Sequence, residues 1–146
     1  MPISGVWVNK RGSVMVLREE SSGHVTGEYR SAAGRDLQVR ELAGRASTID
    51  GNKQMVGFSV CFHTDQPSPQ FGHTSVCTWS GWVRNNTLTT RWLLTRSMSR
   101  EEDEWSSTIV GQDSFEKLSD VYDEGHLTAS KQELEQWLNE TRTRKP

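Results

Sequence analysis

The sequence has little of what marks several common protein classes. Its 146 residues include two cysteines and four prolines, and only 33% of them belong to the hydrophobic set. Two cysteines are too few for a disulfide framework, and Cys61 and Cys77 lack the spacing of metal ligands. So few aliphatic side chains cannot fill a broad core, whereas six tryptophans can line a small barrel.

Neither the charge nor the hydropathy indicates a nucleic acid or a membrane as partner. The formal net charge is −2 with both signs interspersed, so there is no basic footprint for nucleic acid. No apolar run approaches the roughly 20 residues of a membrane-spanning helix. Residues 1–4 lack the apolar stretch of a signal peptide, which predicts a cytoplasmic protein, or a secreted one if a leader was removed.

The sequence also lacks the motifs of common enzymes. It has no Gly-x-Ser-x-Gly turn, no glycine-rich phosphate loop and no paired-histidine metal motif. Its histidines fall near predicted strand ends, in loops or in the tail, without a nucleophile beside them. We therefore expect a protein that is not an enzyme and that has neither a metal site nor a cofactor.

The clearest structural signal is the stretch of residues 75–97. Two runs of alternating residues flank Arg84-Asn85-Asn86, and asparagine tolerates the left-handed backbone of a tight hairpin turn. Alternation places small polar groups and indoles on one face, which predicts a pocket, and it places Cys61 on the opposite face from Cys77, so both thiols are expected to be free. The residues on the pocket face are Ser75, Cys77, Trp79, Trp92 and Leu94.

Alternation elsewhere predicts further short strands. The predicted strands cover residues 5–9, 13–17, 24–31, 38–45, 54–63, the two arms of 75–97, and 104–115. Strands joined in sequence by tight turns or short loops fit an all-β fold, an eight-stranded antiparallel up-and-down barrel whose closure removes exposed edges. Such a barrel is wide enough inside for one small ligand.

The pattern changes after Lys117. Residues 118–128 are polar and are expected to be loose, whereas Ser130-Lys-Gln-Glu133 is a capping box ahead of three spaced apolar residues. We divide the chain into a barrel domain, residues 1–117, and a C-terminal extension, residues 118–146, with a short amphipathic helix. Because this helix has only a narrow apolar stripe, we expect it to be marginal in isolation and dispensable for ligand binding.

Polar and aromatic residues at strand positions form a candidate site. Each polar group would cost about 1–3 kcal/mol if it were buried and unpaired, so the cluster indicates a polar ligand or water among them. A small ligand that is polar at one end and apolar along its length fits. The polar members are Asn9, Ser13, Tyr29, Ser31, Ser75 and Asp113, and the aromatic members are Phe62, Trp79 and Trp92.

At these residues the sequence resembles the avidins and streptavidins. The resemblance covers roughly residues 5–117 and implies high-affinity, non-catalytic binding of biotin, with the ureido ring deepest and the carboxylate at the mouth. The motifs that carry it are Gly-Val-Trp-Val-Asn-Lys-Arg-Gly-Ser, Gly-Glu-Tyr-Arg-Ser-Ala-Ala-Gly, Thr-Trp-Ser-Gly, Arg-Trp-Leu-Leu-Thr and Glu-Trp-Ser-Ser-Thr-Ile-Val-Gly-Gln-Asp-Ser-Phe.

The resemblance implies a role for each candidate. Asn9, Ser13 and Tyr29 match the donors to the ureido oxygen of biotin. Ser31 and Asp113 match the acceptors of its ureido N–H groups, and Ser75 matches a contact of its carboxylate. Phe62, Trp79 and Trp92 match the aromatic walls. Trp105 matches the tryptophan that each subunit lends to its neighbour's site, which implies a homotetramer.

Three positions depart from the family pattern. Phe62 stands where tryptophan is usual, which reduces the apolar wall. Cys77 stands where a threonine hydroxyl usually faces the sulfur of biotin, and a thiol is a weaker donor. Arg35 lies in the loop beside the carboxylate and either pairs with it or points to solvent.

Trp105 also carries an argument for assembly that does not depend on the resemblance. It follows the acidic run Glu101 to Glu104. An indole exposed beside charges is better explained by burial against another chain, because tryptophan is enriched at interfaces. The alternative is that Trp105 packs within its own barrel and that the protein is a dimer or a monomer.

Two other functions remain open from the sequence. The same barrel could bind another small molecule, or act as an assembly scaffold with weakened affinity for biotin. A carbohydrate-binding barrel would instead use Trp82 or Trp137 as an exposed platform beside a shallow groove.

Overall fold

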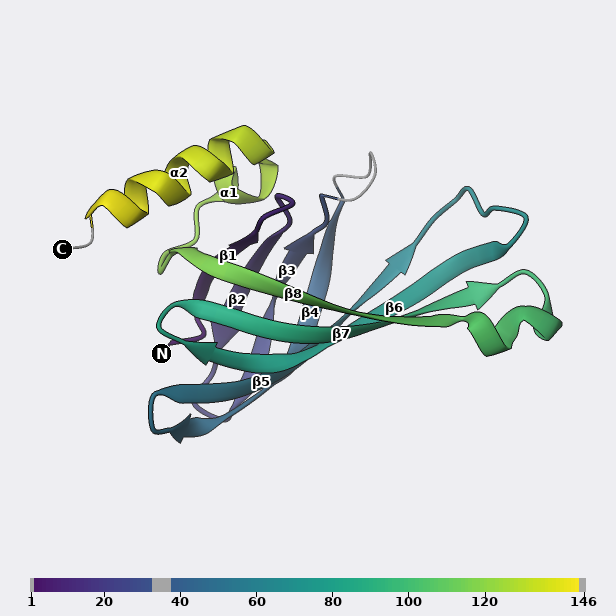
Figure 1. The fold of residues 1–146 in the computed structure, drawn as a ribbon, viewed down its shortest axis with the longest axis horizontal. Coiled ribbons are helices and arrows are strands. Elements are labelled where there is room, and N and C mark those ends of the chain that lie inside the picture. Colours follow the sequence, from purple (N-terminus) through teal and green to yellow (C-terminus); the bar gives the residue numbers. More distant parts are fainter. Residues whose placement is uncertain (1, 33–37, 145–146) are drawn as a thin grey trace.

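The computed structural model describes residues 2–32 and 38–144 and folds them into a closed antiparallel barrel with two helices on its outside (Figure 1). Each strand pairs with the next along the chain, and β8 pairs with β1, so the barrel has no open edge. The predicted fold class is confirmed. The strands are β1 (Gly5–Asn9), β2 (Val14–Glu19), β3 (His24–Arg30), β4 (Val39–Asp50), β5 (Lys53–His63), β6 (Phe71–Arg84), β7 (Thr87–Met98) and β8 (Thr108–Ser119).

The predicted hairpin is β6 and β7. Asn85 and Asn86 have φ angles of 51° and 62°, the left-handed pair that a two-residue hairpin turn requires. This turn sets the register of the two strands, in which Trp79 lies opposite Trp92.

The last predicted strand begins too early. Residues 101–106 form a 3₁₀ helix, η1 (Glu101–Ser106), with acidic residues in its first turn, and β8 starts only at Thr108. Acidic side chains are stabilising near a helix N-terminus, which favours the turn over the strand here. Trp105 therefore lies on η1 and not at the start of the strand.

Strand lengths divide the barrel into a short and a long part. β1 to β3 have 5 to 7 residues, whereas β4 to β8 have 11 to 14. The start of β6, the end of β7 and η1 consequently project beyond the closed part of the barrel, at the end opposite the Asn85-Asn86 turn (Figure 1). The prediction ended this strand at residue 45, whereas β4 runs to Asp50. Few of its side chains are buried, so its sequence alternates only weakly.

The inside of the barrel holds the main core. Side chains from all eight strands meet there, among them Trp7, Met15, Phe58 and Phe115, which are almost fully buried. The inward residues alternate with outward ones along each strand, as a barrel requires.

A second core lies outside the barrel, under the C-terminal extension. The helices α1 (Glu124–Thr128) and α2 (Lys131–Arg144) lie beside β1 and β2 (Figure 1). They cover outward valines of both strands. Among the short strands, β1 and β2 are the ones with an apolar outer face. The second core comprises Val6, Val8, Val14, Val16, Leu118, Leu127, Ala129, Leu134 and Leu138.

The extension is more ordered than the sequence indicates. Leu118 is part of β8, and α1 is capped by Asp123, so the expectation of a loose segment over residues 118–128 is wrong. The capping box before α2 is confirmed: the Glu133 N–H donates to Ser130 Oγ at 3.1 Å, and the Ser130 N–H donates to Glu133 Oε1 at 3.3 Å. No helix in the described part of the chain is long and apolar enough to span a membrane.

Candidate ligand-binding site

A cavity of about 190 Å³ lies at one end of the barrel. The connections that follow β1, β3, β5 and β7 all lie at this end, because the strands run alternately up and down. The cavity brings together most of the residues that the sequence singles out. It is lined by Asn9, Arg11, Ser13, Tyr29, Ser31, Phe62, Cys77, Trp79, Trp92, Leu94 and Asp113.

Two of the predicted residues that the structure describes are not part of this lining. Ser75 lines a shallow depression with His63 and Thr74 next to the cavity. Trp105 is 88% exposed on η1, away from the cavity of its own chain. Arg35 lies outside the described residues.

Two lining residues were missing from the predicted set. Leu94 shares its strand face with Trp92, and the alternation placed it on the pocket face, but it was not included among the candidate site residues. Arg11 comes from the turn between β1 and β2, where no periodicity exists. Only the folded turn brings its side chain to the cavity.

Asn9 is held by the turn that follows it. Its Oδ1 accepts the backbone N–H groups of Arg11 at 3.0 Å and of Ser13 at 2.8 Å. Its Nδ2 donates to Asp113 Oδ2 at 2.6 Å. An amide nitrogen has two hydrogens, so this arrangement fixes the side chain and leaves one N–H for a ligand.

Asp113 is bonded to Asn9 on β1, to Thr90 on β7 and to the next residue of its own strand. Its Oδ1 accepts the N–H of Ser114 at 2.9 Å, and its backbone oxygen accepts the Thr90 hydroxyl at 2.8 Å. Each carboxylate oxygen can accept more than one bond. Asn9 and Asp113 thus form a paired donor and acceptor at the polar end of the cavity.

Three hydroxyls line the cavity, those of Tyr29, Ser13 and Ser31. Burial raises the pKa of Tyr29, and hydrogen bonds with Ser13 and Ser31 oppose that rise only in part. Ser13 Oγ also accepts the N–H of Ala32 at 3.0 Å. The Tyr29 phenol therefore stays neutral at physiological pH and can donate a hydrogen bond.

The aromatic part of the cavity is built around Trp79. Its ring is tilted against Tyr29 at a centroid distance of 5.1 Å and stacked on Phe58 at 5.3 Å. Phe62 meets Tyr29 edge to face at 5.9 Å. Contacts of this geometry add to the stability gained from burial, and they give the cavity a rigid apolar wall.

Both cysteines are free, as predicted. Cys77 is only 6% exposed, and burial raises the pKa of its thiol to about 12. It therefore lines the cavity as a neutral thiol, whereas Cys61 is exposed on the outer face of the barrel.

The described residues offer little support for the other kinds of site. They contain no group of three or more histidine, cysteine or acidic residues that could hold a metal ion. Trp82 and Trp137 are both half-buried, and Trp137 packs against the second core in a T-shaped contact with His126. The expectation that either residue forms an exposed platform for a sugar is therefore wrong.

Comparisons with known proteins point to one family. The model of one protein family, the Avidin family, matches residues 1–118. Avidin from Gallus gallus is 30% identical over 124 residues, which cover 80% of this chain and 78% of that protein. Avidin-related protein 4/5 from Gallus gallus is 29% identical over 130 residues, which cover 82% and 79%.

Proposed function

The chain belongs to the avidin family, whose members are non-catalytic binding proteins, and on that premise we propose that it binds biotin with high affinity in the cavity of its barrel. One observation carries the proposal. The Asn9–Asp113 pair lies at the same cavity as the aromatic wall of Trp79 and Trp92. A cavity of this kind suits a small molecule with a polar head and an apolar body.

The polar end suits a cyclic urea. A urea oxygen accepts several hydrogen bonds, and the donors available to it are the second N–H of Asn9 and the hydroxyls of Ser13 and Tyr29. A urea N–H needs an acceptor, and Asp113 supplies a carboxylate while Ser31 supplies a hydroxyl. Hydrogen bonds to an ionised acceptor are the stronger ones, so Asp113 contributes more than Ser31.

The remaining lining suits the rest of the molecule. Trp79, Trp92 and Leu94 offer an apolar enclosure for the bicyclic ring, and the Cys77 thiol lies beside Trp79 on the same strand face. At the mouth, Arg11 offers a cation for the valerate carboxylate. Arg11 is thus a further candidate, beside Arg35, for the contact with the carboxylate, and Ser75 is left for a contact outside the cavity.

Biotin titration tests the proposal directly. We expect isothermal calorimetry to give one site per chain, and thermal unfolding to shift upward with biotin. A ligand at 100 times its dissociation constant adds about 2.7 kcal/mol to the stability of the folded state.

The matched control is Asp113→Asn, which keeps the size of the side chain and removes the charged acceptor. A wild-type protein that shows neither heat nor a thermal shift would contradict biotin binding and favour the same barrel with another ligand. Binding that Asp113→Asn leaves unchanged would contradict the proposed pose.

We also propose that the protein is a homotetramer in which Trp105 completes the site of a neighbouring subunit. The support is the exposure of this indole, which lies outside its own cavity, together with exposed Leu93 and Val110 on β7 and β8.

A further inference from the structure

Arg30 connects the C-terminal extension to the barrel. It is the last residue of β3, points to the outer face and is only 3% exposed. Its Nη1 donates to the backbone oxygens of Leu127 at 3.0 Å and Ala129 at 2.6 Å, at the C-terminal end of α1. A cation is stabilising at a helix C-terminus, where backbone carbonyls lack partners within the helix.

The same guanidinium also holds the turn between β1 and β2. Its Nη2 donates to the backbone oxygen of Gly12 at 2.8 Å. Burial lowers the pKa of Arg30, and among the described residues no acidic group offsets that cost. The planar fork of arginine can bind carbonyls of two segments at once, which lysine cannot reproduce.

Gly12 is in direct contact with the extension. Its φ is +92°, and a Cβ at this position would lie 3.1 Å from Cβ of Lys131, the first residue of α2. The turn and the helix are therefore packed as closely as a glycine allows.

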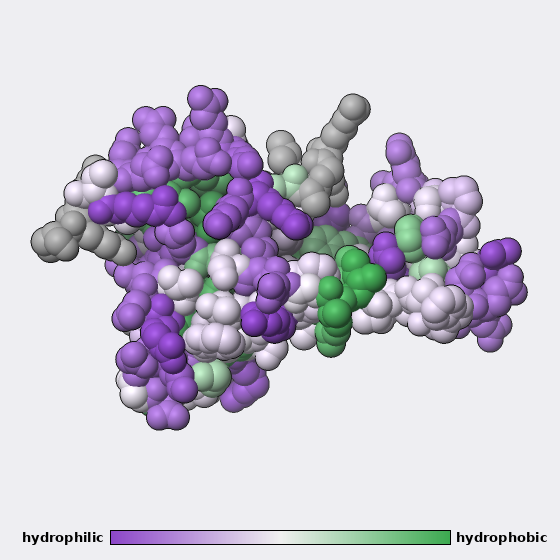
Figure 2. Space-filling model, viewed as in Figure 1, coloured by the Kyte–Doolittle hydropathy of each residue, from purple (hydrophilic) through white to green (hydrophobic). Residues whose placement is uncertain are grey.

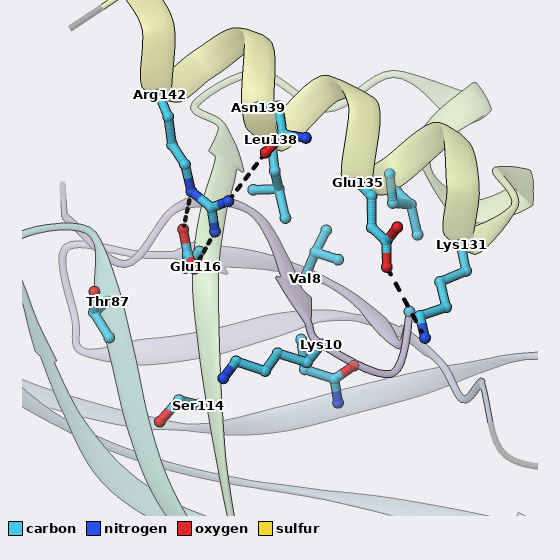
Figure 3. A pocket seen from close by; sticks show the side chains of 13 residues that line it. Val8, Lys10, Thr87, Ser114, Glu116, Lys131, Glu135, Leu138, Asn139 and Arg142 are labelled. Carbon is cyan, nitrogen blue, oxygen red and sulfur yellow. Dashed lines mark hydrogen bonds and ion pairs between the residues drawn. The ribbon is translucent and has the colours of Figure 1, made fainter.

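In addition to these hydrogen bonds, two ion pairs involve α2 (Figure 3). Arg142 reaches from α2 to Glu116 on β8 at 2.6 Å, and Lys131 lies 3.9 Å from Glu135 on its own helix. These pairs are exposed, so each contributes little to stability. The contact of Arg142 lies at the far end of α2 from Gly12, which makes it a useful control.

The turn that Arg30 holds is the turn that orients Asn9. Gly12 lies between Arg11 and Ser13, whose N–H groups donate to Asn9 Oδ1. Asn9 in turn donates to Asp113 at the cavity. A displacement of the Gly12 carbonyl would therefore move the polar end of the cavity.

We propose that the C-terminal extension supports the ligand site indirectly. Through Arg30 it holds residues 9–13 so that Asn9 and Ser13 present their polar groups to the cavity. The proposal rests on the proposed function for the nature of the ligand. It makes Arg30 a positioning residue, and it replaces the expectation from the sequence that the extension is dispensable for binding.

The test uses the full chain with Arg30→Lys, and Arg142→Ala as the control. The direct readout is hydrogen exchange of the Ser13 amide without ligand, because its bond to Asn9 Oδ1 reports on the turn. We expect Arg30→Lys to raise this rate about tenfold, the equivalent of one lost hydrogen bond to a charged group. Amides of β5 and β6 should keep their rates, and Arg142→Ala should leave Ser13 unchanged.

A second pair of variants tests the turn from its other side. Gly12→Ala should raise exchange at Ser13 because the added Cβ meets Lys131, and Gly51→Ala is matched to it. Gly51 also has a positive φ, +65°, but a Cβ there meets nothing within 4 Å. Gly51→Ala thus shows the effect of a Cβ that is added at a positive φ and meets no neighbour, and it should leave Ser13 unchanged.

The biotin off-rate is the second readout. It should rise about tenfold in Arg30→Lys and Gly12→Ala and stay unchanged in the controls. The proposal is overturned if α1 and α2 lose protection in Arg30→Lys while Ser13 keeps its exchange rate. If the wild-type protein does not bind biotin, the proposed function fails, and the exchange at Ser13 still decides the role of Arg30.

Discussion

Among single residues, Asp113 has to accept hydrogen bonds from the protein and from the ligand at the same time. It accepts from Asn9 and from its neighbour's backbone N–H, and it keeps acceptor capacity toward the cavity. Its loss would leave both the Asn9 amide and a ligand N–H without a partner. The cost of such unmatched groups decides the first prediction.

We expect Asp113→Ala to raise the dissociation constant of biotin about 100-fold, because two unpaired donors cost about 1–3 kcal/mol each. Arg35→Ala should cost about 0–1 kcal/mol, because the family resemblance puts Arg35 beside the carboxylate of the ligand, where solvent screens its charge. Calorimetry on both variants decides the matter. A larger loss for Arg35→Ala would mean that the pose is reversed.

Cys77 and Phe62 are positions where affinity can rise. Cys77→Thr replaces a weak donor with a hydroxyl and should slow biotin release, by an amount worth at most about 1 kcal/mol. Phe62→Trp adds apolar area and should also slow release if the wall accepts the larger ring. Stopped-flow displacement measures both. Release that is unchanged or faster in both variants would contradict the match of these positions to the family.

The two thiols should differ sharply in reactivity. Cys61 is exposed, whereas the pKa of Cys77 is raised from 9.0 to about 12 by burial, and only the thiolate reacts readily. At pH 8, iodoacetamide should label the folded protein at Cys61 alone, as mass spectrometry can show. Cys61→Ser should then stay unlabelled until it is unfolded in guanidinium.

The same shift makes stability depend on pH. Because the folded-state pKa of Cys77 is the higher one, its contribution is complete below about pH 9 and is lost as the pH rises through 12. The melting temperature should therefore fall over this range, and Cys77→Ser should reduce the fall. A Cys77→Ser protein with the same alkaline profile would contradict this cause.

Among the elements, the extension differs most from what its sequence indicates, because its packing on the barrel could not be predicted. Its apolar stripe is narrow, as predicted, yet the stripe lies on valines that β1 and β2 turn outward. Helix stability in proteins comes mainly from such packing and not from propensity. Packing on these valines therefore accounts for the stability of the extension.

We expect Leu134→Ala to destabilise the protein by about 2–5 kcal/mol, because Leu134 is fully buried between α2 and the strands. Gln136→Ala, at an exposed position of the same helix, should change stability by less than about 0.5 kcal/mol. Urea unfolding measures both. Equal, small effects would show that α2 is only loosely attached.

At the scale of the whole molecule, a small apolar patch stands out on one face. Figure 2 shows a hydrophobic patch where β7 and β8 cross the face in view. The exposed residues of this region include Leu93 and Val110, and Trp105 lies on η1 between the two strands. An exposed apolar patch on a folded domain often marks an interaction surface, which supports assembly of several chains.

We expect Trp105→Lys to lower the mass in solution and to speed biotin release, because truncating an interface tryptophan often costs about 2 kcal/mol or more. Light scattering and displacement kinetics measure the two effects. Val121→Lys is the matched control, since Val121 is also exposed but lies in the extension. Unchanged mass and release in Trp105→Lys would rule out a shared site.

The sequence by itself determined the barrel and most of the cavity. Alternation assigns each side chain to one face of a strand, and the Asn85-Asn86 turn sets the register of the central hairpin, so Cys77, Trp79 and Trp92 could be placed together in advance. The division into residues 1–117 and 118–146 stays a prediction.

Only the tertiary structure decided the rest, because those features depend on segments that are distant in the sequence. Arg11 reaches the cavity from a turn without periodicity, and η1 displaced the start of the last strand. Arg30 reads as an ordinary surface residue at the end of a strand. It becomes a buried link because the carbonyls of Leu127 and Ala129, about a hundred residues further on, fold back against it.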